Sequence, residues 1–258
     1  MTIKIIDKVI KKFGYSVKKM NALSPSNFPD IKETEFWDIY EFCKPYTMTS
    51  VERMYGLYSS VNYVLQNNIS GVFVECGVWR GGSAMMIAKM LANRNMLDRK
   101  IFLYDTFSGM PIPTADDINI SGREASDMLK DFENDKTVGI WCVAGLNDVQ
   151  ENMRLTCYPQ ENIFYVEGKV EDTIPGNMPV ESIALLRLDT DWYESTRHEL
   201  EYLFPGLVSN GVIIIDDYGH WAGCKKAVDE YFEEHKINIL LNRVDYTCRV
   251  GIKTTATS

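Results

Sequence analysis

The sequence lacks several features that would each define a class of protein. No two of its six cysteines lie within ten residues of one another, so there is no CxxC pair for zinc or thiol redox chemistry. No apolar run approaches the length of a membrane span, and no signal-peptide core opens the chain. The 27 basic residues are outnumbered by 36 acidic ones, which disfavours a nucleic-acid partner. We therefore expect a cytoplasmic protein with reduced thiols and no integral membrane segment.

The composition of the 258 residues is that of an ordinary globular domain, with 45% hydrophobic and 24% charged residues. The first 20 residues carry six lysines and one aspartate, and apolar residues recur at helical spacing from Ile3 to Phe13. We expect residues 1–44 to form an N-terminal helical extension that docks on its own domain or on a second subunit. A membrane surface is the alternative. An exposed helix of this kind makes a homodimer the predicted assembly.

From residue 70 onward, short β-rich runs alternate with helical stretches. The runs are continuously apolar, as in strands buried on both faces of a parallel sheet, so they predict a doubly wound α/β fold. The expected strands are Val72–Cys76, Ile101–Tyr104, Ile163–Val166, Ile183–Leu188 and Val212–Ile215. The expected helices between them are Ser83–Ala92, Glu194–Phe204 and Trp221–His235.

Two further segments belong to this main domain, residues 45–258. The tail around Asn238–Leu241 and Tyr246–Ile252 is expected to supply two more strands, as an antiparallel hairpin. The connection between the second and third strands, residues 106–162, is unusually long and is predicted to be a lid-like insertion, with a peripheral decoration of the fold as the alternative. Short helices are expected in it at Glu124–Phe132 and Asn147–Arg154.

A glycine turn follows the first predicted strand. Glu75 ends the strand, and Gly77 begins the turn that opens the next helix. Ligands of doubly wound sheets bind beyond such strand ends, and glycine lets the backbone approach them closely. An acid there suits the cationic S-adenosylmethionine better than a dinucleotide. At the second strand end, Asp105 is placed to hold the ribose hydroxyls of an adenosine. The alternatives are a plain structural turn and a helix cap.

Four carboxylates follow two later strands, as the pairs Asp189/Asp191 and Asp216/Asp217. Neighbouring ends of parallel strands bring such pairs together, where unpaired charges would repel. A hard divalent cation relieves that repulsion, and oxygen ligands point to Mg²⁺, Mn²⁺ or Ca²⁺. A helix cap and a solvated turn are the structural alternatives. His220 follows closely and is a further candidate base.

Five runs together resemble the macrocin O-methyltransferase family, whose members methylate sugar hydroxyls on antibiotics. They are Tyr46–Arg53, Val74–Ser83, Tyr104–Pro111, Asp189–Thr196 and Ile215–Gly219. The resemblance implies a class I methyltransferase (Rossmann-like) fold, with a seven-stranded, mostly parallel sheet and helices on both faces. It also implies S-adenosylmethionine and Mg²⁺ as cofactors.

The resemblance assigns roles to individual residues. The cofactor-binding residues it implies are Thr47, Ser50, Glu75, Gly77, Ser83, Asp105, Ser108, Gly168 and Val170. Glu75 and Gly77 would flank the methionine part, Asp105 the ribose, and Gly168 and Val170 the adenine. The metal ligands it implies are Asp189, Asp216 and Asp217.

The predicted reaction is in-line transfer of the sulfonium methyl to a hydroxyl of a small-molecule or glycan acceptor, with Asp189 or Asp191 accepting the proton. Three alternatives stay open. They are a catechol-type methyltransferase, a glycosyltransferase that uses Asp189-Thr190-Asp191 as a DxD motif, and a non-catalytic cofactor-binding scaffold.

Overall fold

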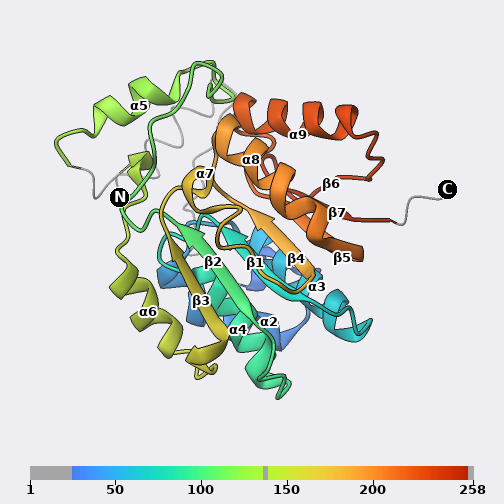
Figure 1. Ribbon diagram of the computed structural model, residues 1–258. Helices are drawn as coiled ribbons and strands as arrows, with labels where there is room; N and C mark the ends of the chain where they lie inside the picture. Colours follow the sequence, from blue (N-terminus) through green and yellow to red (C-terminus); the bar gives the residue numbers. More distant parts are fainter. Residues whose placement is uncertain (1–24, 136–138, 255–258) are drawn as a thin grey trace, which may run out of the picture. The chain divides into compact units, whose positions relative to one another are not determined.

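A computed structural model describes residues 25–135 and 139–254 of the chain (Figure 1). The chain divides into two units, Met1–Trp37 and Asp38–Ser258. The described part of the first unit holds a short 3₁₀ turn, η2 (Pro25–Asn27), and the start of helix α2 (Thr34–Cys43). The amphipathic helix predicted within residues 1–20 lies outside the described residues.

The second unit is built on a seven-stranded sheet with the order β3-β2-β1-β4-β5-β7-β6. Neighbouring strands from β3 to β5 are parallel, and β7 runs antiparallel to both β5 and β6. The strands are β1 (Val72–Cys76), β2 (Ile101–Asp105), β3 (Ile163–Glu167), β4 (Ile183–Leu188), β5 (Leu207–Ile215), β6 (Asn242–Arg243) and β7 (Arg249–Ile252). The predicted mostly parallel sheet is confirmed.

Helices cover both faces of this sheet (Figure 1). One face carries α3 (Val51–Gln66) and α4 (Gly82–Asn93), and the other carries α7 (Val170–Thr173), α8 (Tyr193–Leu203) and α9 (Ala222–Glu234). Within the described residues, no helix has both the length and the apolar character needed to cross a bilayer.

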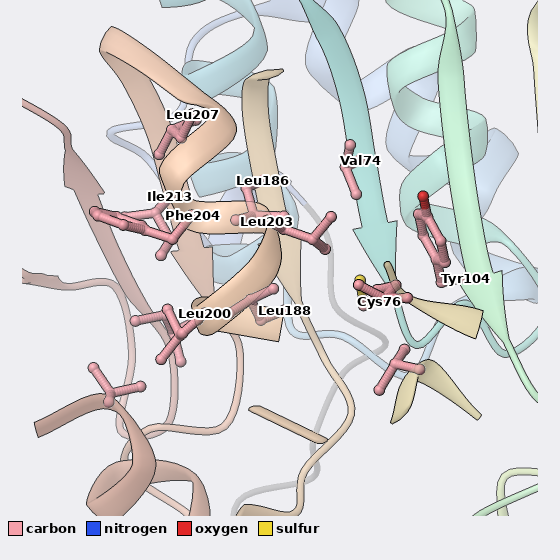
Figure 2. Packing of buried hydrophobic residues seen from close by; sticks show 14 of the residues in the cluster. Val74, Cys76, Tyr104, Leu186, Leu188, Leu200, Leu203, Phe204, Leu207 and Ile213 are labelled. Atoms are coloured by element: carbon pink, nitrogen blue, oxygen red, sulfur yellow. The ribbon is translucent and has the colours of Figure 1, made fainter. Parts of the chain in front are cut away.

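The main apolar core lies between the sheet and α8 and α9. Figure 2 shows Leu200 and Leu203 of α8 against Leu186 and Leu188 of β4. Both α8 leucines have no exposed surface. Burying a leucine side chain stabilises a fold by about 1.5–3 kcal/mol, so this layer holds β4 firmly where its carboxyl end enters the site.

The insertion between β2 and β3 contains helices α5 (Ala125–Asp131) and α6 (Leu146–Arg154), close to the two predicted segments. Asp117 anchors the insertion to the domain, because its fully buried carboxylate accepts a 2.8 Å hydrogen bond from the backbone N–H of Tyr193, at the start of α8. Trp192 Nε1 donates to the carbonyl of Pro111 at 3.1 Å. The insertion is thus a docked cap over the strand ends.

Three elements differ from the sequence predictions. Helix α3 was not predicted, whereas α2 lies within the predicted N-terminal helical extension, residues 1–44. Strand β5 begins at Leu207 rather than Val212, and the Asn210-Gly211 pair that suggests a turn lies within it, with Asn210 in the left-handed region at φ +66°. In the tail, the segment 238–241 is not a strand; β6 is the pair Asn242–Arg243, which forms the predicted antiparallel hairpin with β7.

Candidate active site

A cleft opens beyond the carboxyl ends of β1, β2, β4 and β5, the edge where a doubly wound sheet binds ligands. Most of the residues singled out from the sequence line it. They are Thr47, Gly77, Ser83, Asp105, Gly168, Val170, Asp189, Asp191, Asp216, Asp217 and His220. The insertion contributes the opposite wall, which includes Met110, Pro111, Ile140 and Cys142.

The glycine turn after β1 packs directly on the loop after β4. Gly77 has φ +81°, and a Cβ there would lie 2.0 Å from the carbonyl oxygen of Asp189. The backbone N–H of Asp189 donates to the carbonyl of Cys76 at 2.8 Å. Only glycine fits this contact, so residue 77 fixes the position of the first acid of the β4 pair.

Asp105 ends β2 and organises the turn as well as facing the cleft. Its Oδ2 accepts the backbone N–H groups of Val78 and Trp79 at 2.6 and 3.1 Å, and its Oδ1 accepts that of Phe107 at 2.7 Å. The Thr106 hydroxyl is a long second donor to Oδ1, at 3.4 Å, so a ligand hydroxyl would bind Asp105 by replacing this weak bond. Burial nevertheless raises the pKa of this carboxyl above its usual value, against the lowering effect of these bonds.

Three carboxylates, those of Asp189, Asp191 and Asp217, bring one oxygen each within 4.8 Å of one another. Burial, followed by repulsion among the acids, raises the pKa of Asp189 and of Asp217 well above the usual value. Burial also raises the pKa of Asp191 to about 7. The Oδ2 atom of Asp217 is buried without a hydrogen-bond donor among the described residues. The three acids therefore resist ionising together, and a cluster of oxygen ligands of this kind suits a hard divalent cation, which would favour their charged forms.

Asp216 differs from the predicted ligand set because both of its oxygens are held by arginines. Arg187 Nη2 lies 2.8 Å from Oδ1, and Arg53 Nη1 contacts Oδ2. Although burial raises the pKa of Asp216, the two guanidinium groups outweigh it and hold the pKa below its usual value. In the structure, Asp191 rather than Asp216 completes the cluster with Asp189 and Asp217.

Three predicted cofactor residues do not line the cleft. Glu75 is 1% exposed and its Oε1 lies 2.5 Å from Arg187 Nη1, so it acts on the site through that arginine. The Ser50 hydroxyl caps α3 by accepting the N–H of Arg53, and donates to Asp245 at 3.1 Å. Ser108 is exposed, and its N–H bonds the Thr106 hydroxyl.

Arg187 is the main residue that sequence reasoning missed. It lies on β4 with 3% of its side chain exposed, and Asp189 Oδ2 lies 2.8 Å from its Nη1. Arg187 therefore links Glu75, on β1, to Asp189, which follows β4, and to Asp216, which follows β5. The only signal in the sequence was a single basic residue within an otherwise apolar strand.

His220 lies in the cleft, and its Nδ1 is 3.3 Å from the hydroxyl of Tyr246. Burial, followed by the nearby Arg53, lowers the pKa of His220 below its usual value, so the imidazole is neutral at pH 7.

The order of strands, the single antiparallel strand and the ligand cleft at the strand ends define a class I methyltransferase, the fold used by S-adenosylmethionine-dependent enzymes. The family model of the macrocin O-methyltransferases (TylF) matches residues 9–251. The chain belongs to this family and is an O-methyltransferase, so the predicted resemblance is confirmed and the DxD glycosyltransferase alternative is wrong.

Individual relatives support this family assignment. The chain is 31% identical over 186 residues to the demethyldecarbamoylnovobiocin O-methyltransferase of Streptomyces niveus, covering 72% of this chain and 67% of that one. It is 33% identical over 202 residues to the 8-demethyl-8-(2,3-dimethoxy-alpha-L-rhamnosyl)-tetracenomycin-C 4'-O-methyltransferase of Streptomyces olivaceus, covering 78% and 73%.

Among solved structures, the O-methyltransferase NovP is similar with a TM-score of 0.70 and 31% identity, over 81% of this chain and 82% of that one. The calicheamicin methyltransferase CalS11 shares the fold, with a TM-score of 0.62 and 18% identity over 92% and 98% of the two chains.

Proposed function

We propose that this O-methyltransferase transfers the methyl group of S-adenosylmethionine to a sugar hydroxyl with the help of Mg²⁺. The observation that carries the proposal is that the acids of β4 and β5 share one cleft with the glycine turn and Asp105. The rhamnosyl group in the name of the S. olivaceus relative supports a sugar as the acceptor. All four strand-end acids line the cleft, which argues against a non-catalytic scaffold.

Six lining residues are proposed to bind the cofactor: Thr47, Gly77, Ser83, Asp105, Gly168 and Val170. Gly77 lets the methionine part approach the backbone, Asp105 accepts the ribose hydroxyls, and Gly168 and Val170 border the adenine. The sulfonium and ammonium groups are cations, so the acidic floor of the cleft attracts them.

The acids fit a magnesium ion, because they offer only oxygen ligands and one of those oxygens is buried without a donor from the part of the chain that the structure describes. We assign Asp189 and Asp217 as two ligands. Asp216 is the proposed third, which requires an arginine to release one of its oxygens. Arg53 has a second carboxylate within reach, since its Nε lies 3.3 Å from Asp245. When bound, Mg²⁺ would hold two neighbouring hydroxyls of the acceptor and make one of them more acidic.

The residues of the chain then position the reactants and take the proton. The hydroxyl oxygen forms a bond to the methyl carbon while the carbon–sulfur bond breaks, and S-adenosylhomocysteine leaves as a neutral thioether. The carboxylate of Asp191 accepts the hydroxyl proton. Burial raises its pKa to about 7 in the absence of a metal ion, and a neighbouring divalent cation would lower it, so the group is ionised and can accept a proton at neutral pH. The insertion wall limits the access of water to the reacting atoms.

Binding of S-adenosylhomocysteine by calorimetry tests the cofactor site. Asp105→Asn is expected to weaken binding at least about 10-fold, because it removes a charged hydrogen-bond acceptor. Glu167→Gln is the matched control, since Glu167 is the register partner of Asp105 on β3 but does not line the cleft. Equal affinities for the two variants, or no binding to the wild type, would refute the cofactor assignment.

Titration with Mn²⁺ followed by electron paramagnetic resonance tests the metal site without relying on activity. Asp217→Asn and Asp216→Asn should each weaken Mn²⁺ binding, whereas Asp191→Asn should leave it nearly unchanged. Asp116→Asn removes an exposed acid of the insertion and serves as the control. If Asp191→Asn weakens Mn²⁺ binding and Asp216→Asn does not, Asp191 is the third ligand and cannot be the free base. No binding to the wild type would refute the metal site.

We also propose that the protein works in the cytoplasm, because all six cysteines are free and such thiols persist in a reducing compartment. The homodimer remains a prediction.

A further inference from the structure

We infer that the insertion fixes the separation of the two acid pairs of the cleft, and that Asp117 is the positioning residue through which it does so. The pairs are Asp189/Asp191 after β4 and Asp216/Asp217 after β5. The inference rests on the proposed function, because it concerns the geometry of the proposed metal site. The sequence predictions gave Asp117 no role.

The insertion holds the two residues that follow the first acid pair. The indole Nε1 of Trp192, a residue 2% exposed, donates to the carbonyl of Pro111 at 3.1 Å. The backbone N–H of Tyr193 donates to Asp117 Oδ1 at 2.8 Å. Asp191 has a left-handed backbone, with φ +69°, and a residue with a side chain keeps this conformation where its surroundings fix it. The contacts with the insertion therefore fix the chain just beyond this acid.

The same part of the insertion holds the segment that follows the second acid pair. Asn119 forms an antiparallel bridge with Trp221, and the backbone N–H of Ala222 donates to the carbonyl of Ile118 at 2.8 Å. The rings of Trp192 and Trp221 meet edge to face, with their centroids 4.9 Å apart. The segments beyond β4 and β5 thus contact each other and are both bound to the insertion.

The Asp117 carboxylate lies where these contacts meet. It has no exposed surface, and its Oδ2 accepts the backbone N–H and the hydroxyl of Thr114 at 2.7 and 2.9 Å. A Cβ at Gly223, in the first turn of α9, would lie 2.1 Å from Asp117 Oδ1 and 3.1 Å from the backbone nitrogen of Tyr193. The carboxylate is therefore bonded to the insertion and to α8 and packed directly on α9, which leaves these three elements little freedom to move apart.

A magnesium ion needs ligands held at a nearly fixed separation, because its octahedral geometry is strict. One oxygen from each of Asp189, Asp191 and Asp217 lies within 4.8 Å of the others, so this cluster takes acids from both segments. Residues that orient metal ligands from outside the coordination sphere typically contribute about 10- to 100-fold to metal affinity. Removing the Asp117 carboxylate should therefore weaken the metal site, although Asp117 does not line the cleft.

Titration of the full chain with Mn²⁺, followed by electron paramagnetic resonance, tests the inference without an acceptor. Asp117→Ala should weaken Mn²⁺ binding by at least about 10-fold and change the line shape of the bound ion. Gly223→Ala is a second variant, because its added methyl group displaces the Asp117 carboxylate while every acid stays in place. It should weaken Mn²⁺ binding by at least about 3-fold.

Two controls separate positioning from other effects. Asp116→Asn is the matched control, since Asp116 also links the insertion to α9, through Lys226 at 3.0 Å, but this pair is exposed. Exposed pairs contribute little, so its Mn²⁺ affinity should stay within about 2-fold of the wild type. Leu91→Ala removes a fully buried side chain near the end of α4, whereas the start of that helix lines the cleft. It should lower the free energy of unfolding but keep the wild-type Mn²⁺ affinity.

The outcomes distinguish this inference from the proposed function. Wild-type Mn²⁺ affinity in either folded variant, Asp117→Ala or Gly223→Ala, would overturn the inference and leave the proposed metal site intact. A loss of affinity in Leu91→Ala equal to that in Asp117→Ala would also overturn it, because general destabilisation would then explain both. Absence of Mn²⁺ binding to the wild type would refute the metal site and the inference together.

Discussion

Replacing Arg187 by methionine is expected to destabilise the protein severely. The guanidinium, 3% exposed, lies 2.5 to 2.8 Å from carboxylate oxygens of Glu75, Asp189 and Asp216. Methionine fills part of the volume but leaves these acids without their shared cation. Removing one partner of a buried ion pair costs about 3–5 kcal/mol, which is a large share of the roughly 5–15 kcal/mol that holds a domain folded.

Urea unfolding followed by the fluorescence of the five tryptophans measures this loss. Arg197→Met is the control, because Arg197 pairs with Glu234 at the surface, and its loss should stay below about 1 kcal/mol. Adding Glu75→Gln to Arg187→Met should recover part of the stability, since a neutral amide needs no counter-charge. A loss below about 1 kcal/mol for Arg187→Met, or strictly additive effects in the double variant, would refute the shared-cation reasoning.

Three further predictions concern other residues of the cleft and of the core. Gly77→Ala should destabilise by about 1–3 kcal/mol more than Gly122→Ala in urea unfolding, because both glycines have positive φ but only a Cβ at 77 meets backbone. The initial rate should rise with pH as Asp191 loses its proton, with a midpoint below about 7 because a bound cation lowers the pKa of a neighbouring carboxyl. Asp191→Asn should abolish this rise, and a flat wild-type profile would contradict the assignment. Burial raises the pKa of Glu199 well above 4.5, so the unfolded chain loses this proton first and the folded wild type loses stability as the pH rises above 4.5. The melting temperature of Glu199→Gln should therefore increase relative to that of the wild type between pH 5 and 8.

The sequence was informative where a local pattern determines the structure. Five apolar runs and their terminal acids gave the parallel strands and the edge of the sheet that holds the site, because side-chain burial and strand ends are readable from neighbouring residues. Helix α3 was less readable. Gly56, Ser59 and Ser60 weaken its helical pattern, and Gly56 is explained only by the side chain of Val244, which would lie 3.2 Å from a Cβ there.

The state of each acid could not be read in the same way, because it depends on partners distant in the chain. Asp216 and Asp217 are adjacent and look equivalent in the sequence. Yet Arg53, 163 positions away, and Arg187, 29 away, hold Asp216, whereas no residue within 25–135 or 139–254 donates to Oδ2 of Asp217. Glu75 shows the same effect, since an acid expected to face the cofactor is instead buried against Arg187. Ion pairs between residues of different strands therefore determine which of several similar carboxylates can bind a metal ion. The affinities of the Asp191 and Asp216 variants for Mn²⁺ test this conclusion directly.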